Sequence, residues 1–210
     1  RRLTFRGDVG LAALSPDGTM LAYVADTEPS QLFVKDLTGD TELMVADSIG
    51  LAYDLRWAPT GDRLAFAGDY QGTTGTFIFP RLGGEARPLG LAAQIAWGPE
   101  GHRIALCPPD HFKPVAIHNL RSGRVDSIPF PGSDQFAVGI DWSPRGDRLA
   151  LATQSGSREF HLWVLDLEAG AYSIGIDGLV QGIAFSAAFD GRNDYAVAGY
   201  TTPVPEPSTE

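Results

Sequence analysis

The sequence predicts an all-β fold, a β-propeller built from four-stranded antiparallel blades. A short motif, P-x-G-x-x-[L/I]-A, occurs four times along the chain. Its copies lie about 40 to 45 residues apart, which is the period of a propeller blade. The 25 glycines and 15 prolines are spread along the chain, as many short strands and turns require. We expect either about five blades in this chain or an incomplete part of a six- to eight-bladed ring.

Each copy of the motif predicts a hairpin of two inner strands. An apolar run ends in Leu14, Trp57, Trp97 or Trp142, where a large side chain fills the space between neighbouring sheets. Proline presets φ for a turn and the glycine two positions later permits positive φ, so the chain reverses there. The alanine of the second strand lets the next sheet approach closely. The structural residues of the repeat are therefore Pro16, Gly18, Trp57, Pro59, Gly61, Trp97, Pro99, Gly101, Trp142, Pro144 and Gly146.

The repeat divides the chain into successive units. We expect one propeller domain over residues 1–200, followed by a disordered, proline-rich tail over residues 201–210. Two outer strands follow the first hairpin, at Gln31–Asp36 and Glu42–Val45. The segment Arg1–Phe5 is predicted to be an outermost strand whose blade lies elsewhere in the ring. The units span residues 6–48, 49–90, 91–132 and 133–177, with a partial fifth over 178–200.

Composition excludes several classes of partner. The formal net charge is −10, which argues against nucleic acid or an anionic membrane, because both attract concentrated Lys and Arg. No run approaches the roughly 20 apolar residues of a membrane span, so we expect no membrane insertion by this segment. The single cysteine, Cys107, excludes an internal disulfide and is predicted to be a buried, unreactive thiol at the end of a strand.

Three copies of the motif read W-[S/A/G]-P-x-G-x-x-[L/I]-A, and this pattern resembles the bacterial WD40-like propeller repeats of the PD40 or TolB type. The resemblance covers roughly residues 1–200. The opening, Leu3–Val24, resembles the start of propeller sensor domains attached to bacterial serine/threonine kinases and winged-helix regulators. Such domains lie outside the cytoplasm, so the resemblance implies a periplasmic or extracellular location. The segment Val204–Thr209 resembles the opening of the PEP-CTERM sorting signal of exported proteins.

The sequence contains no evident catalytic constellation. It has no G-x-S-x-G nucleophile elbow, no phosphate-binding loop and no spacing typical of metal ligands, so we expect neither enzymatic activity nor a cofactor or metal. Four acidic residues recur in the P-x-G turns and are expected to gather on one face. Two interpretations remain open: a negative rim that attracts a basic partner, or ordinary turn residues. These residues are Asp17, Asp62, Glu100 and Asp147.

Variable loops on the opposite face, such as Asp26–Ser30 and Asp69–Gly75, are a second place where specificity resides. The leading interpretation is a non-catalytic module that presents a surface to a protein or peptide, as the sensor or scaffold of an exported or membrane-attached protein. The alternatives are a gating propeller of a prolyl-oligopeptidase-like peptidase and an exported PEP-CTERM surface protein.

Overall fold

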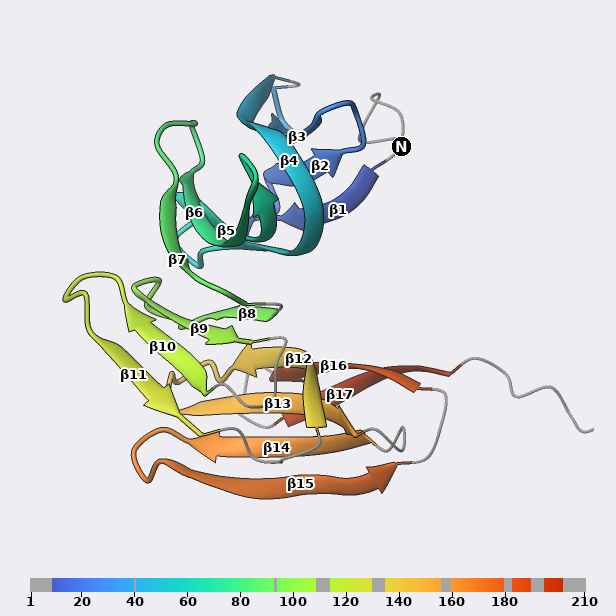
Figure 1. The fold of residues 1–210 in the computed structure, drawn as a ribbon, viewed down its shortest axis with the longest axis vertical. Coiled ribbons are helices and arrows are strands. Elements are labelled where there is room, and N and C mark those ends of the chain that lie inside the picture. The colour runs from blue at the N-terminus through green and yellow to red at the C-terminus, as the bar shows by residue number, and fades with distance from the viewer. Residues whose placement is uncertain are drawn as a thin grey trace, which may run out of the picture. The chain divides into compact units, whose positions relative to one another are not determined.

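The computed structural model describes residues 9–39, 41–92, 94–108, 114–129, 135–155, 160–179, 183–189 and 195–201. Every regular element in this part of the chain is a β-strand, and every described pairing between strands is antiparallel (Figure 1). The prediction of an all-β fold is therefore confirmed. The segment Arg1–Phe5 and residues 202–210, for which an outer strand and a disordered tail were predicted, lie outside the described residues.

The chain divides into two compact units, and the first contains Arg1–Pro109 and Lys113–Pro129. Its strands form a seven-stranded sheet in the order β1 to β7 and a four-stranded sheet in the order β11-β10-β9-β8. The bounds of the first sheet are β1 (Val9–Leu14), β2 (Met20–Ala25), β3 (Ser30–Asp36), β4 (Glu42–Trp57), β5 (Arg63–Tyr70), β6 (Thr73–Pro80) and β7 (Arg87–Gly90). Those of the second are β8 (Gln94–Trp97), β9 (Arg103–Cys107), β10 (Val115–Asn119) and β11 (Val125–Ile128).

The seven-stranded sheet is two blades that share one strand. Strand β4 has 16 residues; its first part pairs with β3 and its second part with β5. The prediction that separated Glu42–Val45 from the next inner strand was wrong, because the strand continues between them. Its pairing register shifts on both sides there, and the φ of Ser48 is 57°. Ile49 pairs with Ser30 on one side and with Tyr70 on the other. Blade 1 is therefore β1, β2, β3 and the first part of β4, and blade 2 is the rest of β4 with β5, β6 and β7.

The second unit contains Asp110–Phe112 and Phe130–Glu210. It has a four-stranded sheet in the order β12-β13-β14-β15 and a two-stranded hairpin, β16-β17. Strand β15 ends two residues after the predicted fourth unit, and β17 ends at Thr201, the first residue of the predicted tail. The bounds are β12 (Gln135–Trp142), β13 (Arg148–Ser155), β14 (Phe160–Asp166), β15 (Ala171–Leu179), β16 (Ile183–Phe189) and β17 (Tyr195–Thr201).

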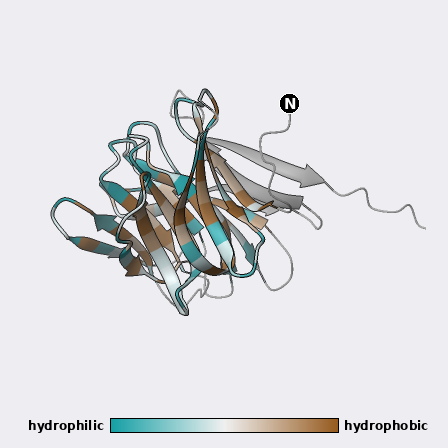
Figure 2. Ribbon diagram, turned by 90° about the horizontal axis from the view of Figure 1, so that it is seen from above, coloured by the Kyte–Doolittle hydropathy of each residue, from teal (hydrophilic) through white to brown (hydrophobic). Residues whose placement is uncertain are grey.

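The core of the first unit lies between its blades, and strand β5 shows how one strand serves two interfaces. Leu64 and Phe66 face blade 1 in a cluster with Trp57, whereas Ala65 and Ala67 face blade 3 in a cluster with Trp97. All four β5 side chains are fully buried, and the hydrophobic residues follow the strands (Figure 2). The small side chains let the next sheet approach, as the repeat predicted.

The tryptophans of the repeat are buried, with Trp57, Trp97 and Trp142 between 5% and 8% exposed. The equivalent residue of blade 1 behaves differently, since Leu14 is 56% exposed. The expectation that Leu14 fills a gap between sheets was wrong.

Candidate functional site

The four P-x-G turns share one geometry. In each, the glycine N–H donates to the carbonyl of the residue before the proline, at 2.8 or 2.9 Å. The N–H of the residue before the proline donates to the carbonyl oxygen of the first residue of the second strand, at 2.8 to 3.0 Å. The φ angles of Gly18, Gly61, Gly101 and Gly146 lie between 68° and 75°, a region that disfavours side chains. The turns therefore hold the repeat's glycines in the left-handed conformation.

The acidic residues of these turns accept hydrogen bonds from other residues of the same turn. The Ser15 hydroxyl, the Thr19 N–H and the Thr19 hydroxyl all donate to Oδ1 of Asp17. These bonds, that of Ser15 first, lower the pKa of Asp17 from 3.8 to about 2. Asp62 accepts bonds from Thr60 and Arg63. The same turn chemistry that favours aspartate thus accounts for both positions.

Arginine neutralises part of the proposed rim. Glu100 pairs with Arg103, and Asp62 pairs with Arg63. For both carboxylates burial alone would raise the pKa, but the hydrogen bond and charge of the neighbouring arginine outweigh it, and the pKa is lowered. In the second unit, the Ser143 hydroxyl donates to Asp147 at 2.8 Å. Each of the four acidic residues therefore has a local role, and Asp17 alone among those of unit 1 lacks a paired arginine among the described residues.

A second turn, between the third and fourth strands of each blade, has hydrogen bonds that recur from blade to blade and that the P-x-G motif does not predict. In three blades Oδ1 of the turn's first side chain accepts bonds from the backbone N–H groups two and three residues later. These side chains are Asp36, Asn119 and Asp166. Blade 2 has Pro80 at this position, which offers neither a side-chain acceptor nor a backbone N–H.

The residue after the first residue of this outer turn makes a hydrogen bond that recurs in every blade. Its N–H donates to the carbonyl of the residue that follows the P-x-G glycine, at 2.7 to 3.0 Å in all four blades. Three blades place a half-buried leucine here, at Leu37, Leu120 and Leu167. Blade 2 has Arg81 instead, followed by Leu82, which is 73% exposed. The turn of blade 2 therefore departs from the repeat at two successive residues.

Blade 1 departs from the repeat at the opposite position. The second strand begins with arginine in three blades, at Arg63, Arg103 and Arg148, but with Met20 in blade 1. Each of these residues pairs across the hairpin with the first residue of the outer turn. Aligning the four copies residue by residue shows both Met20 and Arg81 as exceptions, and this is the signal that would have found them.

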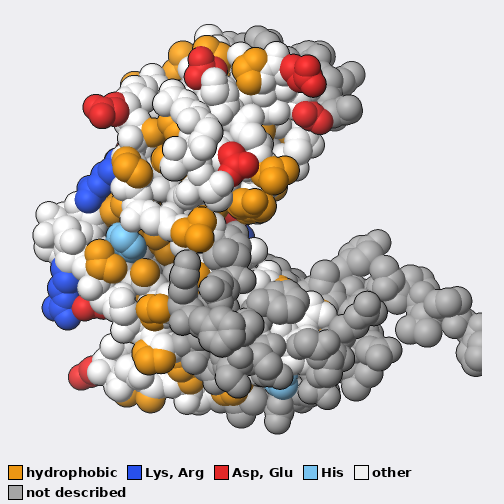
Figure 3. Space-filling model, viewed as in Figure 1, with side chains coloured by type: hydrophobic (Ala, Val, Ile, Leu, Met, Phe, Trp, Pro, Cys, Tyr) orange, Lys and Arg blue, Asp and Glu red, His pale blue; other side chains and the backbone are white. Residues whose placement is uncertain are grey.

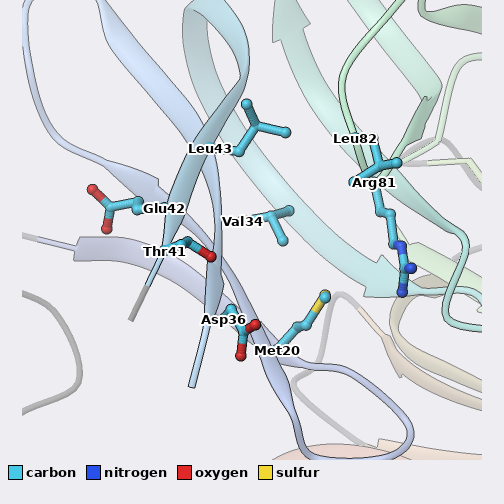
Figure 4. Close-up of a pocket in the computed structure, with 8 residues that line it drawn as sticks. All are labelled: Met20, Val34, Asp36, Thr41, Glu42, Leu43, Arg81 and Leu82. Atoms are coloured by element: carbon cyan, nitrogen blue, oxygen red, sulfur yellow. The ribbon is translucent and has the colours of Figure 1, made fainter. Parts of the chain in front are cut away.

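Met20 and Arg81 line the same groove, which lies between blades 1 and 2 (Figure 4). The groove has a volume of about 300 Å³. Asp36 and Glu42 lie on the blade 1 side, and Arg81 with Leu82 comes from the outer turn of blade 2. The remaining lining residues are Val34, Thr41 and Leu43. A smaller hollow of about 100 Å³ adjoins it, also lined by Met20 and Arg81, between the first two P-x-G turns.

No family model matches the chain, and no curated protein matches it. Solved structures do. TolB from Acinetobacter baumannii is 16% identical with a TM-score of 0.66, over 92% of this chain and 52% of its own length. A putative TolB from Agrobacterium tumefaciens is 18% identical with a TM-score of 0.67, over 94% of this chain and 72% of its own. The fold is that of a β-propeller, similar to the fold of these TolB structures.

A puromycin-hydrolyzing peptidase from Mycobacterium tuberculosis is also similar, at 14% identity and a TM-score of 0.65. The match covers 94% of this chain but 35% of the peptidase. The chain thus spans about half of the first TolB and about a third of the peptidase. At these identities the likeness shows the propeller fold alone.

Polar side chains also join neighbouring propeller blades. Asp54, near the end of β4, is buried, and its Oδ2 accepts a 3.0 Å hydrogen bond from the N–H of Ile95 in blade 3. Its Oδ1 accepts bonds from the Leu55 N–H and from Arg56, both at 2.9 Å. This carboxylate therefore joins the inner strands of two blades.

Other candidate chemistry is sparse in the described residues. No group of three or more His, Cys, Asp or Glu side chains there is arranged to hold a metal ion. In the same residues no helix is long and apolar enough to span a bilayer. Cys107 is fully buried, and burial raises the pKa of its thiol to about 12, as expected for an unreactive cysteine. Of the variable loops, Asp26–Ser30 and Asp69–Gly75 are described.

Proposed function

We propose that this propeller is a non-catalytic binding module that presents a surface to a protein or peptide. One observation carries the proposal: polar groups of the repeat serve the fold, while large apolar side chains stay exposed. The exposed set includes Leu43, Met44, Leu51, Tyr53 and Leu82, each between 41% and 73% exposed. Figure 3 shows one face of the molecule on which acidic and hydrophobic side chains are interspersed. Exposed apolar side chains on a rigid β-scaffold are typical of protein interaction sites.

A location outside the cytoplasm, in a sensor or scaffold of an exported or membrane-attached protein, completes the proposal. Its support is the resemblance of Leu3–Val24 to propeller sensor domains together with the TolB-type fold. The PEP-CTERM alternative depends on Val204–Thr209, which lies outside the described residues.

The second candidate is a gating propeller of a prolyl-oligopeptidase-like peptidase. The likeness to the puromycin-hydrolyzing peptidase favours it, because this chain matches only a third of that protein. A hydrolase domain with a G-x-S-x-G segment in the same reading frame would support this candidate. A kinase or winged-helix domain with a membrane span would support the sensor instead, and an apolar helix with an arginine-rich end would support the surface protein.

The binding proposal is tested with the purified chain and a displayed library of random peptides. We expect enrichment of peptides that bind with micromolar or tighter affinity, measured by calorimetry. A parallel assay with peptide and ester substrates measures turnover. The proposal fails if no peptide is enriched, or if the isolated chain hydrolyses a substrate.

A further inference from the structure

The groove between blades 1 and 2 is lined by residues at which these two copies differ from the rest of the repeat. The outer turn of blade 2 has lost its side-chain acceptor at Pro80, has a charge where other blades have leucine, and exposes Leu82. Blade 1 contributes Met20 where other blades have arginine. Such departures weaken local structure without an evident gain in stability, and they concentrate at functional sites.

The groove has an apolar floor. Val34 is buried beneath it at 6% exposure, and Leu43 and Leu82, from opposite blades, are 41% and 73% exposed. Figure 4 shows Val34 between Glu42 and Arg81, with Leu43 above it and with Asp36 and Met20 below it. A volume of about 300 Å³ accepts one large apolar side chain with part of its backbone. The floor therefore selects an apolar residue.

The two sides of the groove carry opposite charge. On one side, Oδ1 of Asp36 holds three hydrogen bonds from Thr38 and Gly39, while no bond to Oδ2 is present within the described residues. These bonds, that of the Thr38 hydroxyl first, lower the pKa of Asp36, so it is ionised at neutral pH. On the other side, Arg81 lies 3.5 Å from the Gly61 carbonyl oxygen. A negative and a positive side chain therefore lie on the two sides of the apolar floor.

We infer that this groove binds an extended segment of a partner protein in which a basic, a large apolar and an acidic side chain occupy alternate positions. Alternate residues of an extended chain point to the same side, about 7 Å apart. The basic residue pairs with Asp36, the apolar residue packs between Leu43 and Leu82, and the acidic residue pairs with Arg81. The inference rests on the proposed function and names the partner's chemistry and its site.

The test uses a fluorescein-labelled seven-residue peptide with lysine, leucine and glutamate at alternate positions and glycine or serine elsewhere. Fluorescence anisotropy measures its affinity for the chain. We expect binding that weakens about tenfold when the peptide's leucine becomes serine. Binding also weakens when salt rises from about 0.1 M to about 1 M, because the charge pairs are exposed. Absence of binding by the parent peptide overturns the inference.

Substitutions in the chain test where the peptide binds. Leu82→Ser is expected to weaken binding about tenfold, whereas Val125→Ser, which changes an exposed valine on β11 outside the groove, leaves it unchanged. Arg81→Glu is expected to bind the parent peptide about fivefold more weakly. It is expected to bind a peptide with lysine at both charged positions about fivefold more tightly. A gain of affinity cannot result from misfolding, so the charge swap remains decisive if Leu82→Ser unfolds the chain.

The outcomes separate this inference from the proposed function. Displayed peptides that bind equally well to the chain and to Leu82→Ser would refute the groove as the binding site. They would still support the proposal that the chain is a binding module. Association of the chain with itself that Leu82→Ser abolishes, measured by analytical ultracentrifugation, would instead identify a second copy as the occupant and overturn the peptide.

Discussion

The indole Nε1 of Trp57 donates a 2.9 Å hydrogen bond to the carbonyl oxygen of Ala13, 44 residues earlier in the chain. Trp97 makes the equivalent bond to the carbonyl of Arg56, 41 residues earlier, at 3.4 Å. In both cases the acceptor immediately precedes the residue that aligns with the tryptophan in the previous blade. The tryptophan therefore fills the gap between two sheets and also fixes their relative register.

Replacing Trp57 by phenylalanine keeps a large aromatic side chain and removes the donor. We expect Trp57→Phe to lower the free energy of unfolding by about 1 to 2 kcal/mol, through the lost hydrogen bond and imperfect packing. Trp97→Phe is the matched variant, and its longer bond predicts a smaller loss. Urea unfolding measures both. Equal losses would show that the bond to Ala13 contributes nothing beyond packing.

Asp54 joins the inner strands of blades 2 and 3 through its two carboxylate oxygens. In Asp54→Asn one oxygen becomes an NH₂ group, which faces either the Leu55 N–H or the Ile95 N–H. A buried donor is then left without an acceptor, and we expect a loss of about 1 to 3 kcal/mol in the free energy of unfolding. Asp47→Asn, at an exposed position of the same strand, is expected to change it by less than about 0.5 kcal/mol.

The carboxyl group of Asp17 links stability to pH. Hydrogen bonds from Ser15 and Thr19 lower the pKa of Asp17 from 3.8 to about 2. A pKa depressed by folding stabilises the native state above the unfolded value and loses that effect as pH falls through the folded value. We therefore expect stability to decline between about pH 4 and pH 2, and Asp17→Asn to reduce this decline. Titration of the carboxyl by NMR checks the pKa, and a value near 3.8 would refute the assignment.

Thr76 in β6 is fully buried, and its hydroxyl has no hydrogen-bond partner among the described residues. Thr76→Val replaces the hydroxyl by a methyl group of similar size, so we expect the free energy of unfolding to rise by about 1 kcal/mol. Thr153 is also fully buried, but its hydroxyl donates to Gln135 at 2.5 Å. The same substitution there is expected to destabilise the second unit by a similar amount. Thermal unfolding that moves in one direction for both variants would contradict this explanation.

The repeat predicted the blades well because its residues serve short-range needs. Proline and glycine determine each P-x-G turn within four residues, and the alternation of Leu64, Ala65 and Phe66 assigns the two faces of a strand. The same pattern failed at Leu14, because burial of that position depends on a neighbouring sheet and not on the hairpin itself. It also failed to join the two parts of β4, because Asp47, Ser48 and Gly50 are residues typical of turns. The strand nevertheless continues through them, with shifted pairing registers and a φ of 57° at Ser48.

The candidate groove was not predicted from the sequence. The features that the copies share include the acidic turn residues, which the structure places in local hydrogen bonds or ion pairs. The groove is lined instead by residues at which single copies differ, Met20 and Arg81. Only the adjacency of blades 1 and 2 brings these two departures together, and adjacency across a sheet interface is not encoded in the pattern of either copy.

The unbroken course of β4 has a consequence for protein engineering. Repeat proteins are normally cut, permuted or recombined at the junction between two repeats, where a loop tolerates new chain ends. Here the junction between blades 1 and 2 lies inside a hydrogen-bonded strand, with Ile49 paired on both sides. The first two blades must therefore be exchanged between relatives, or expressed as a fragment, as one piece.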